Sequence, residues 1–301
     1  MFNTEITIAG VTFKNPVMTA SGTFGSGMEY SEFVDLNCLG AVVTKGVANV
    51  PWEGNPTPRV QETYGGMLNA IGLQNPGVDV LIERDVPFLK QYDTRIIVNV
   101  CGREVSDYVE VVEKLADQPV DLLEINVSCP NVRHGGIAFG QDPKCLYDIT
   151  KEVKAKAKQP IIMKLSPNVT DIAEMAKAAE AAGSDAVSLI NTITGMKIDI
   201  HKRTFALANK TGGLSGPAIK PVAVRMVYQV ANAVKIPVIG MGGIANAEDA
   251  IEFMLAGATG VAVGAMNFVN PCTTIEVIKG IEDYMRRYHI ENLVDLIGTV
   301  Q

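Results

Sequence analysis

The stretch Pro237-Val-Ile-Gly-Met-Gly-Gly-Ile-Ala-Asn246 leads through a helical pattern over Ala247–Ala256 into Gly260-Val-Ala-Val-Gly-Ala265. Its two short runs are apolar throughout, which is typical of parallel strands that are buried on both faces. Gly257 follows the helical pattern, where a left-handed glycine commonly ends a helix. The stretch therefore predicts a strand–helix–strand unit of an α/β protein.

The same alternation extends over the whole chain. Eight strand–helix units in 301 residues predict a single (β/α)8 TIM barrel over residues 1–301. An open doubly wound sheet is the alternative, although the turn after the first strand lacks the GxGxxG dinucleotide pattern. The predicted strands are Pro16–Thr19, Ala41–Thr44, Ile96–Val100, Leu122–Asn126, Ile161–Leu165, Ala186–Ile190, Pro237–Gly240 and Gly260–Val263. The predicted helices are Ser31–Leu36, Val78–Gln91, Ser106–Ala116, Pro143–Lys158, Asp171–Ala182, Ala218–Val234, Ala247–Ala256 and Thr274–His289.

Two segments lie outside this repeat. Glu5–Phe13, with Ala-Gly at its middle, predicts an N-terminal β-hairpin that could plug the barrel floor. Thr192–Pro217 is a long excursion after strand six, too long for a simple loop, and predicts a lid or a contact surface. Asp142 and Thr170 are the predicted N-caps of the fourth and fifth helices.

The composition is that of an ordinary globular protein, with 47% hydrophobic and 20% charged residues and a formal net charge of −7. This charge and the lack of a Lys/Arg run argue against a nucleic-acid partner. Five scattered cysteines without a CxxC pair give no disulfide, zinc or iron–sulfur pattern and fit a reducing compartment. No signal peptide or membrane-length apolar run is found, so we expect a cytoplasmic protein that does not enter a membrane.

The chemistry of a (β/α)8 barrel lies at the carboxyl ends of its strands. Lys45 and Lys164 emerge there from apolar strands, and a lysine inside a barrel needs an anionic partner. Gly242-Gly243 and Gly264-Ala265 follow strands seven and eight, whose loops commonly hold phosphate through backbone N–H groups. Ordinary turn glycines are the alternative interpretation. The strand ends carry no Asp, Glu or His cluster, so no metal site is expected.

Cys129 lies in Asn126-Val-Ser-Cys-Pro-Asn131, directly after the fourth predicted strand and before a glycine-bearing loop. A small buried hydrophobe is the commoner fate of a free cysteine, but a thiol between two amides at a strand end also suits catalysis. His134 in the following loop is a rival acid or base. His201 and His289 are expected on the surface.

Several segments together resemble the dihydroorotate dehydrogenases over essentially the whole chain. The most specific are Asn69-Ala-Ile-Gly-Leu-Gln-Asn-Pro-Gly77 and Asn126–Asn131. The cysteine at position 129 resembles the soluble class 1 branch of this family, because the membrane-associated class 2 branch has serine at the same position. Ala20-Ser-Gly-Thr-Phe-Gly25 resembles the NAD-linked type 1B catalytic subunit more than the fumarate-linked type 1A homodimer. The other matching segments are Asn15–Gly25, Thr44-Lys-Gly46 and the two glycine turns.

The resemblance implies oxidation of dihydroorotate to orotate in pyrimidine (UMP) biosynthesis, with hydride transfer from C6 to N5 of FMN. It implies that Cys129 is the base at C5, that Lys164 stabilises negative charge at the flavin N1 and O2 side, and that Lys45 pairs with the substrate carboxylate. The implied FMN-binding residues are Ala20, Ser21, Lys45, Gly46, Asn99, Asn126, Lys164, Ile190, Gly216, Gly242, Gly243, Gly264 and Ala265. The implied substrate-binding residues are Lys45, Asn69, Ala70, Ile71, Gly72, Leu73, Asn126, Asn131, Asn191 and Thr192.

The resemblance also implies a partner subunit with FAD and a 2Fe-2S cluster that passes electrons to NAD+, in a heterotetramer of two catalytic and two electron-transfer chains. Four alternatives stay open at this point. The chain could be a fumarate-linked type 1A enzyme or another FMN barrel reductase of pyrimidines. It could also be a flavin-free phosphate-binding isomerase or aldolase in which Lys164 forms a Schiff base, or a non-catalytic binding barrel.

Overall fold

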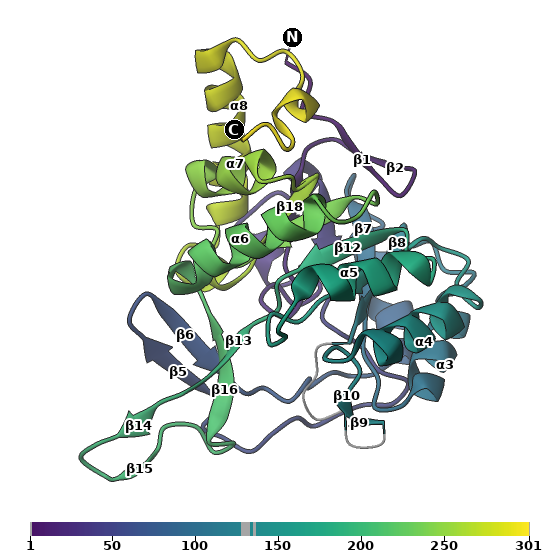
Figure 1. The fold of residues 1–301 in the computed structure, drawn as a ribbon, viewed down its shortest axis with the longest axis vertical. Helices are drawn as coiled ribbons and strands as arrows, with labels where there is room; N and C mark the ends of the chain where they lie inside the picture. The colour runs from purple at the N-terminus through teal and green to yellow at the C-terminus, as the bar shows by residue number, and fades with distance from the viewer. Residues whose placement is uncertain (1, 128–132, 135–136, 301) are drawn as a thin grey trace.

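The computed structural model describes residues 2–127, 133–134 and 137–300 of the chain (Figure 1). Within these residues, eight parallel strands close into a barrel in the order β11-β12-β17-β18-β3-β4-β7-β8. The predicted (β/α)8 barrel is therefore confirmed, and the open doubly wound alternative is wrong. The strands are β3 (Val17–Thr19), β4 (Ala41–Val43), β7 (Arg95–Val100), β8 (Leu122–Asn126), β11 (Ile161–Lys164), β12 (Ala186–Leu189), β17 (Val238–Met241) and β18 (Gly260–Val263).

The helices form the outer layer, and each helix from α3 to α8 contacts the next along the chain. The last of them, α8, packs against β3 and so completes the ring. None of the helices in the described residues has both the length and the apolar character of a membrane span. The helices are α1 (Val78–Val80), a π-helical turn (Leu81–Asp85), α2 (Val86–Leu89), α3 (Val105–Leu115), α4 (Pro143–Lys154), α5 (Ile172–Ala181), α6 (Lys220–Ala231), α7 (Ala247–Leu255) and α8 (Thr273–Tyr288).

Two local predictions are wrong, one for a helix near the amino terminus and one for the N-cap of α5. The predicted helix over Ser31–Leu36 is replaced by two 3-10 turns, Tyr30–Glu32 and Leu36–Cys38. The helix cannot run through this segment because the Asp35 side chain accepts a hydrogen bond from the Asn37 N–H and starts the second turn.

The N-cap of α5 is Asp171 rather than the predicted Thr170, since the Asp171 carboxylate accepts hydrogen bonds from the N–H groups of Ala173 and Glu174. A carboxylate at this position satisfies two free N–H groups of the first turn and also favours the positive end of the helix dipole. The predicted cap Asp142 is confirmed, because its side chain accepts a hydrogen bond from Cys145 N at 2.8 Å.

The predicted N-terminal hairpin is confirmed as β1 (Ile6–Ile8) paired with β2 (Val11–Phe13). Ala9 and Gly10 form its turn with φ of 51° and 80°, as expected for the type I′ turn that matches the twist of a hairpin. Ile6 and Ile8 are buried. A β-carbon at Gly260, the first residue of β18, would lie 3.2 Å from Ile8 Cδ1. The hairpin therefore closes the amino-terminal end of the barrel.

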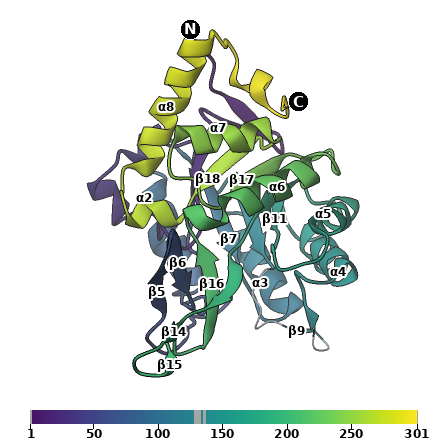
Figure 2. The ribbon, with the colours of Figure 1, turned by 60° about the vertical axis from the view of Figure 1, so that its left-hand side comes forward.

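The excursion after β12 forms part of a separate antiparallel sheet at the opposite end. The order of this sheet is β13-β16-β6-β5, and Figures 1 and 2 show it extending beyond the barrel with β14 and β15 near its tip. Its role as a lid or contact surface stays a prediction. The strands outside the barrel are β5 (Val60–Thr63), β6 (Gly66–Asn69), β9 (Arg133–His134), β10 (Ile137–Ala138), β13 (Ile193–Met196), β14 (Ile198–Asp199), β15 (Thr204–Phe205) and β16 (Thr211–Ser215).

Candidate active site

Four neighbouring barrel strands meet at one buried carboxylate. Glu124 on β8 is 2% exposed. Its Oε1 accepts a hydrogen bond from Asn99 Nδ2 at 2.6 Å and forms an ion pair with Lys164 Nζ at 3.2 Å. Its Oε2 accepts a hydrogen bond from Ser188 Oγ at 2.9 Å. The barrel register explains this cluster, since Asn99 is the β7 partner of Glu124 and Lys164 is the β11 partner of Ser188.

Neither Glu124 nor Ser188 was predicted from the sequence. A signal for Glu124 was nevertheless present, because it precedes Asn126 by two residues on one strand and so shares its face. A charged residue in the otherwise apolar run Leu122-Leu-Glu-Ile125 needs a partner when it is buried. Predicting that partner requires the barrel register, which the sequence does not supply.

Lys45, which follows β4, lies close enough to Lys164 for their charges to interact. Burial lowers the pKa of the Lys45 ammonium. An electrostatic contribution from Cys101 opposes this shift, and the like charge of Lys164 adds to it. The structure therefore brings the two predicted lysines together at the carboxyl ends of the strands. A pair of partly desolvated cations favours an anionic ligand.

The Asn99 amide presents a buried acceptor. Its Nδ2 is held by Glu124, while its Oδ1 has no hydrogen-bond partner among the described residues. A β-carbon at Gly46 would lie 2.5 Å from this oxygen, so glycine leaves the space in front of it open. Because a buried acceptor without a partner is costly, the Asn99 oxygen suits a ligand that donates a hydrogen bond.

Asn126 and Asn191, which were both predicted, lie together, with Asn191 Nδ2 3.4 Å from Asn126 Oδ1. The following residue, Thr192, is held by its backbone, because its carbonyl accepts a hydrogen bond from Asn168 Nδ2 at 3.1 Å. Asn168 also binds the N–H of Thr194 and was missed in the sequence. It fixes the start of the excursion over the end of β12.

Asn69 reaches the same region through the excursion sheet. It is the β6 register partner of Gly213 on β16, and a β-carbon at Gly213 would clash with the Thr192 side chain. The segment after Asn69 is held by Asn55, which donates hydrogen bonds to the carbonyls of Ala70 and Ile71. The roles of Asn69, Ala70, Ile71, Gly72 and Leu73 in substrate binding stay predictions.

The predicted phosphate-binding glycines line one side of the same end of the barrel. Gly243 has a φ of 86°, and a β-carbon there would lie 2.9 Å from the Gly216 carbonyl. A β-carbon at Gly242 would lie 3.2 Å from Ile190 Cγ1, and one at Gly264 would lie 3.4 Å from Ala20 Cβ. These short distances show that the predicted positions are neighbours in three pairs: Gly243 and Gly216, Gly242 and Ile190, and Gly264 and Ala20. Ser21 follows Ala20, and Ala265 begins a 3-10 turn over Ala265–Phe268.

Two predicted residues, Cys129 and Asn131, lie outside the described residues. His134, the rival acid or base, belongs to β9. His201 and His289 are exposed, as predicted. A search of the described residues finds no group of three His, Cys, Asp or Glu side chains that could hold a metal ion.

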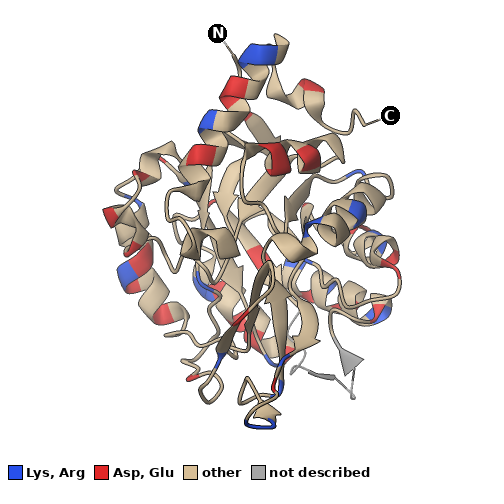
Figure 3. Cartoon of the chain, turned by 90° about the vertical axis from the view of Figure 1, so that its left-hand side faces the viewer, with Lys and Arg blue, Asp and Glu red and all other residues tan. Residues whose placement is uncertain are grey.

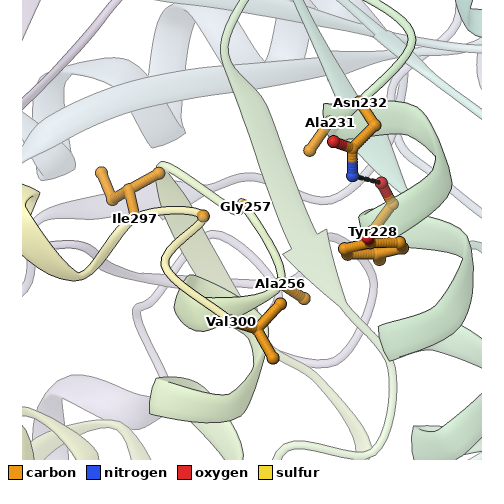
Figure 4. A pocket seen from close by; sticks show the side chains of 8 residues that line it. Tyr228, Ala231, Asn232, Ala256, Gly257, Ile297 and Val300 are labelled. Carbon is orange, nitrogen blue, oxygen red and sulfur yellow. Dashed lines mark hydrogen bonds between the residues drawn. The ribbon is translucent and has the colours of Figure 1, made fainter.

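Two surface features lie away from this site. A pocket of about 330 Å³ is bounded by Tyr228 and Asn232 of the α6 region, Gly257 after α7 and Val300 near the carboxyl terminus (Figure 4). Its position on the outer layer separates it from the lysines inside the barrel. Acidic and basic residues are interspersed along the outer helices in Figure 3, and neighbouring helices form ion pairs such as Lys220–Glu252 between α6 and α7 at 2.7 Å.

The sequence of the chain matches those of one enzyme family over almost its whole length. The sequence model of the family described as dihydroorotate dehydrogenase matches residues 3–285. Among curated proteins, "Dihydroorotate dehydrogenase B (NAD(+)), catalytic subunit" of Lachnoclostridium phytofermentans is 73% identical over 299 residues, which cover 99% of this chain and 100% of that protein. Proteins with the same name from Alkaliphilus oremlandii and Thermoanaerobacter pseudethanolicus are 68% and 56% identical, each over 99% of both chains.

Proposed function

Because the chain belongs to the dihydroorotate dehydrogenase family, we propose that it is the catalytic subunit of an NAD-linked enzyme that oxidises dihydroorotate to orotate in pyrimidine biosynthesis. The observation that carries this proposal is the pair Lys45 and Lys164 at the carboxyl ends of the barrel strands, beside the buried amide of Asn99. Glu124 offsets only part of this positive charge through its ion pair with Lys164, and the remaining charge favours a carboxylated substrate and a phosphorylated cofactor.

FMN is the cofactor that this family implies, and the residues present fit it. The Asn99 oxygen is a buried acceptor that lacks a partner among the described residues, which suits an N–H donor of a flat heterocycle. Gly46 leaves that oxygen accessible. We assign the phosphate to the turns that contain Gly243 and Gly264, where backbone N–H groups can approach an anion closely. We propose that all the FMN-binding residues implied by the family resemblance bind this cofactor.

FMN supplies the hydride acceptor when it is bound. In this proposal, Lys45 binds the substrate carboxylate, and the amides of Asn69, Asn126 and Asn191 fix the orientation of the substrate ring. The proposed substrate set also includes Ala70, Ile71, Gly72, Leu73, Asn131 and Thr192. Lys164 provides a preorganised positive charge beside the cofactor, and Cys129 accepts the proton from C5.

We further propose that electrons leave through a partner chain. The name "catalytic subunit" of the relatives implies such a partner for them. We assign FAD and a 2Fe-2S cluster to it, in a heterotetramer of two catalytic and two electron-transfer chains. In this proposal the chain is a single catalytic domain over residues 1–301, and its scattered cysteines suit a reducing cytoplasm.

The proposal is tested with the purified chain. We expect a yellow protein whose FMN absorbance bleaches anaerobically with dihydroorotate but not with dihydrouracil. The isolated chain should reduce NAD+ only after the partner subunit is added. A colourless protein that cannot be reconstituted with FMN would contradict the assignment of the cofactor. Bleaching by dihydrouracil alone would contradict the assignment of the substrate. Full turnover with fumarate and no partner would contradict the NAD-linked type.

The lowered pKa of Lys45 predicts how orotate affinity depends on pH. The ammonium loses its proton below the usual lysine pKa of about 10.4. Since only the charged form attracts the ligand carboxylate, the dissociation constant of orotate should rise as the pH rises through this lowered pKa. The Lys45→Arg variant stays charged and should show a flatter profile at pH values below the usual lysine pKa of about 10.4. Titration of the flavin spectrum with orotate measures the dissociation constant at each pH. The same pH dependence in the wild type and in Lys45→Arg would contradict the role of Lys45.

A further inference from the structure

Like its donor Ser188, Glu124 has no role in the proposed chemistry. It binds donors from three other strands: Asn99 on β7, Lys164 on β11 and Ser188 on β12. Together with β8 these strands are consecutive in the barrel. Its carboxylate is therefore fixed from several directions deep inside the barrel.

Fold stability does not account for such an arrangement. A buried ion pair contributes little or nothing relative to apolar side chains of similar volume, because the desolvation of both charges offsets their attraction. The other residues of β8 are the apolar Leu122, Leu123 and Ile125 and, at the end of the strand, Asn126. A charge at this position is thus better explained by what it does to its neighbours.

The first effect concerns the Asn99 amide. Because a carboxylate only accepts hydrogen bonds, it fixes Nδ2 of Asn99 toward Glu124 and turns Oδ1 away. Oδ1 is the buried acceptor that faces the space left by Gly46. Glu124 thereby determines which atom of the amide the site presents to a ligand.

The second effect concerns charge. Lys45 and Lys164 are two like charges that interact at one end of the barrel, and Glu124 contacts Lys164. A carboxylate 3.2 Å from the ammonium holds Lys164 in one place and offsets part of its positive potential. The net positive charge felt by a bound cofactor therefore depends on Glu124.

We propose that Glu124 is a positioning residue for the cofactor site: it orients the Asn99 amide and the Lys164 ammonium, and it moderates the positive charge beside the flavin. This inference rests on the proposed function, because it takes the ligand to be FMN. It predicts that loss of the negative charge makes bound FMN easier to reduce and weakens its binding.

The test compares four variants with the wild-type chain reconstituted with FMN. Glu124→Gln removes the charge at nearly constant volume, and Glu124→Asp keeps the charge on a shorter side chain. Ser188→Ala removes one donor without changing any charge. Asp85→Asn is the matched control, since Asp85 is also a buried carboxylate, 3% exposed, but binds Ser26 and Arg84 outside this cluster.

Three quantities are measured without substrate: the thermal midpoint of the apo-protein, the FMN dissociation constant and the reduction potential of bound FMN. For Glu124→Gln we expect a more positive potential and a dissociation constant about tenfold higher, by analogy with the outer-shell partners of metal ligands. Glu124→Asp should shift the potential in the same direction by less. Ser188→Ala and Asp85→Asn should keep the wild-type potential.

A Glu124→Gln protein with wild-type potential and FMN affinity, changed only in its thermal midpoint like Asp85→Asn, would show that Glu124 merely ties the strands together. If Glu124→Gln does not fold, the Glu124→Asp potential decides in its place, and an unshifted value overturns the inference. Failure of the proposed function is recognised separately, because the wild-type chain would then not bind FMN or not be reduced by dihydroorotate.

Discussion

The Lys164→Ala variant is expected to lose about 3–5 kcal/mol of unfolding free energy, because it leaves the Glu124 carboxylate buried without its cation. Both side chains are almost fully buried, at 6% exposed for Lys164 and 2% for Glu124. Water cannot readily replace the lost ion pair, and the hydrogen bonds from Asn99 and Ser188 compensate only in part. Urea unfolding of the apo-protein measures the loss without a contribution from bound cofactor.

A second substitution separates the stability effect from the functional one. Adding Glu124→Gln to Lys164→Ala removes the uncompensated charge while retaining an acceptor and a side chain of similar volume. We expect the double variant to be more stable than the sum of the two single effects predicts, as is usual for residues in direct contact. It should still bind FMN poorly, because the ammonium beside the cofactor is missing. Strictly additive losses, or normal FMN affinity in Lys164→Ala, would contradict this account.

The barrel was predictable because its strands carry a strong local signal. The runs Leu122–Asn126 and Gly260–Val263 are strands with the predicted bounds, since burial on both faces favours a short and mainly apolar run. The hairpin β5–β6 was missed, because its four-residue strands are mostly exposed or partly buried and β6 begins with glycine, so their hydrophobic pattern resembles that of a loop.

The site was predictable where one residue type at a strand end carries the meaning, as for Lys45 and Lys164. It was not predictable where the role of a residue depends on its contacts with residues on other strands. Asn99 and Glu124 are 25 residues apart and become partners only through the β7–β8 register. Asn168 likewise acts on Thr192 across the barrel end. Such pairs follow from the closed fold, which fixes the register, and not from any local pattern.

The Cys129→Ala variant is expected to slow the reduction of FMN by dihydroorotate about 10²–10⁴-fold, the range that a general base typically contributes. A free thiol has a pKa of about 8.5, so a modest decrease makes it a base near neutral pH. Removal of the thiol leaves no acceptor for the C5 proton but keeps the charges of Lys45 and Lys164 and the Asn99 amide. FMN affinity should therefore stay at the wild-type value while the single-turnover rate falls.

Anaerobic stopped-flow reduction over a range of pH measures this effect. The wild-type rate should rise with pH as the thiol ionises, and Cys129→Ala should lose that dependence. Cys38→Ala is the matched control, because Cys38 is an exposed free cysteine in the turn before β4, and it should keep the wild-type rate. A decrease of less than tenfold in Cys129→Ala, together with a large decrease in His134→Gln, would transfer the role of the base to His134.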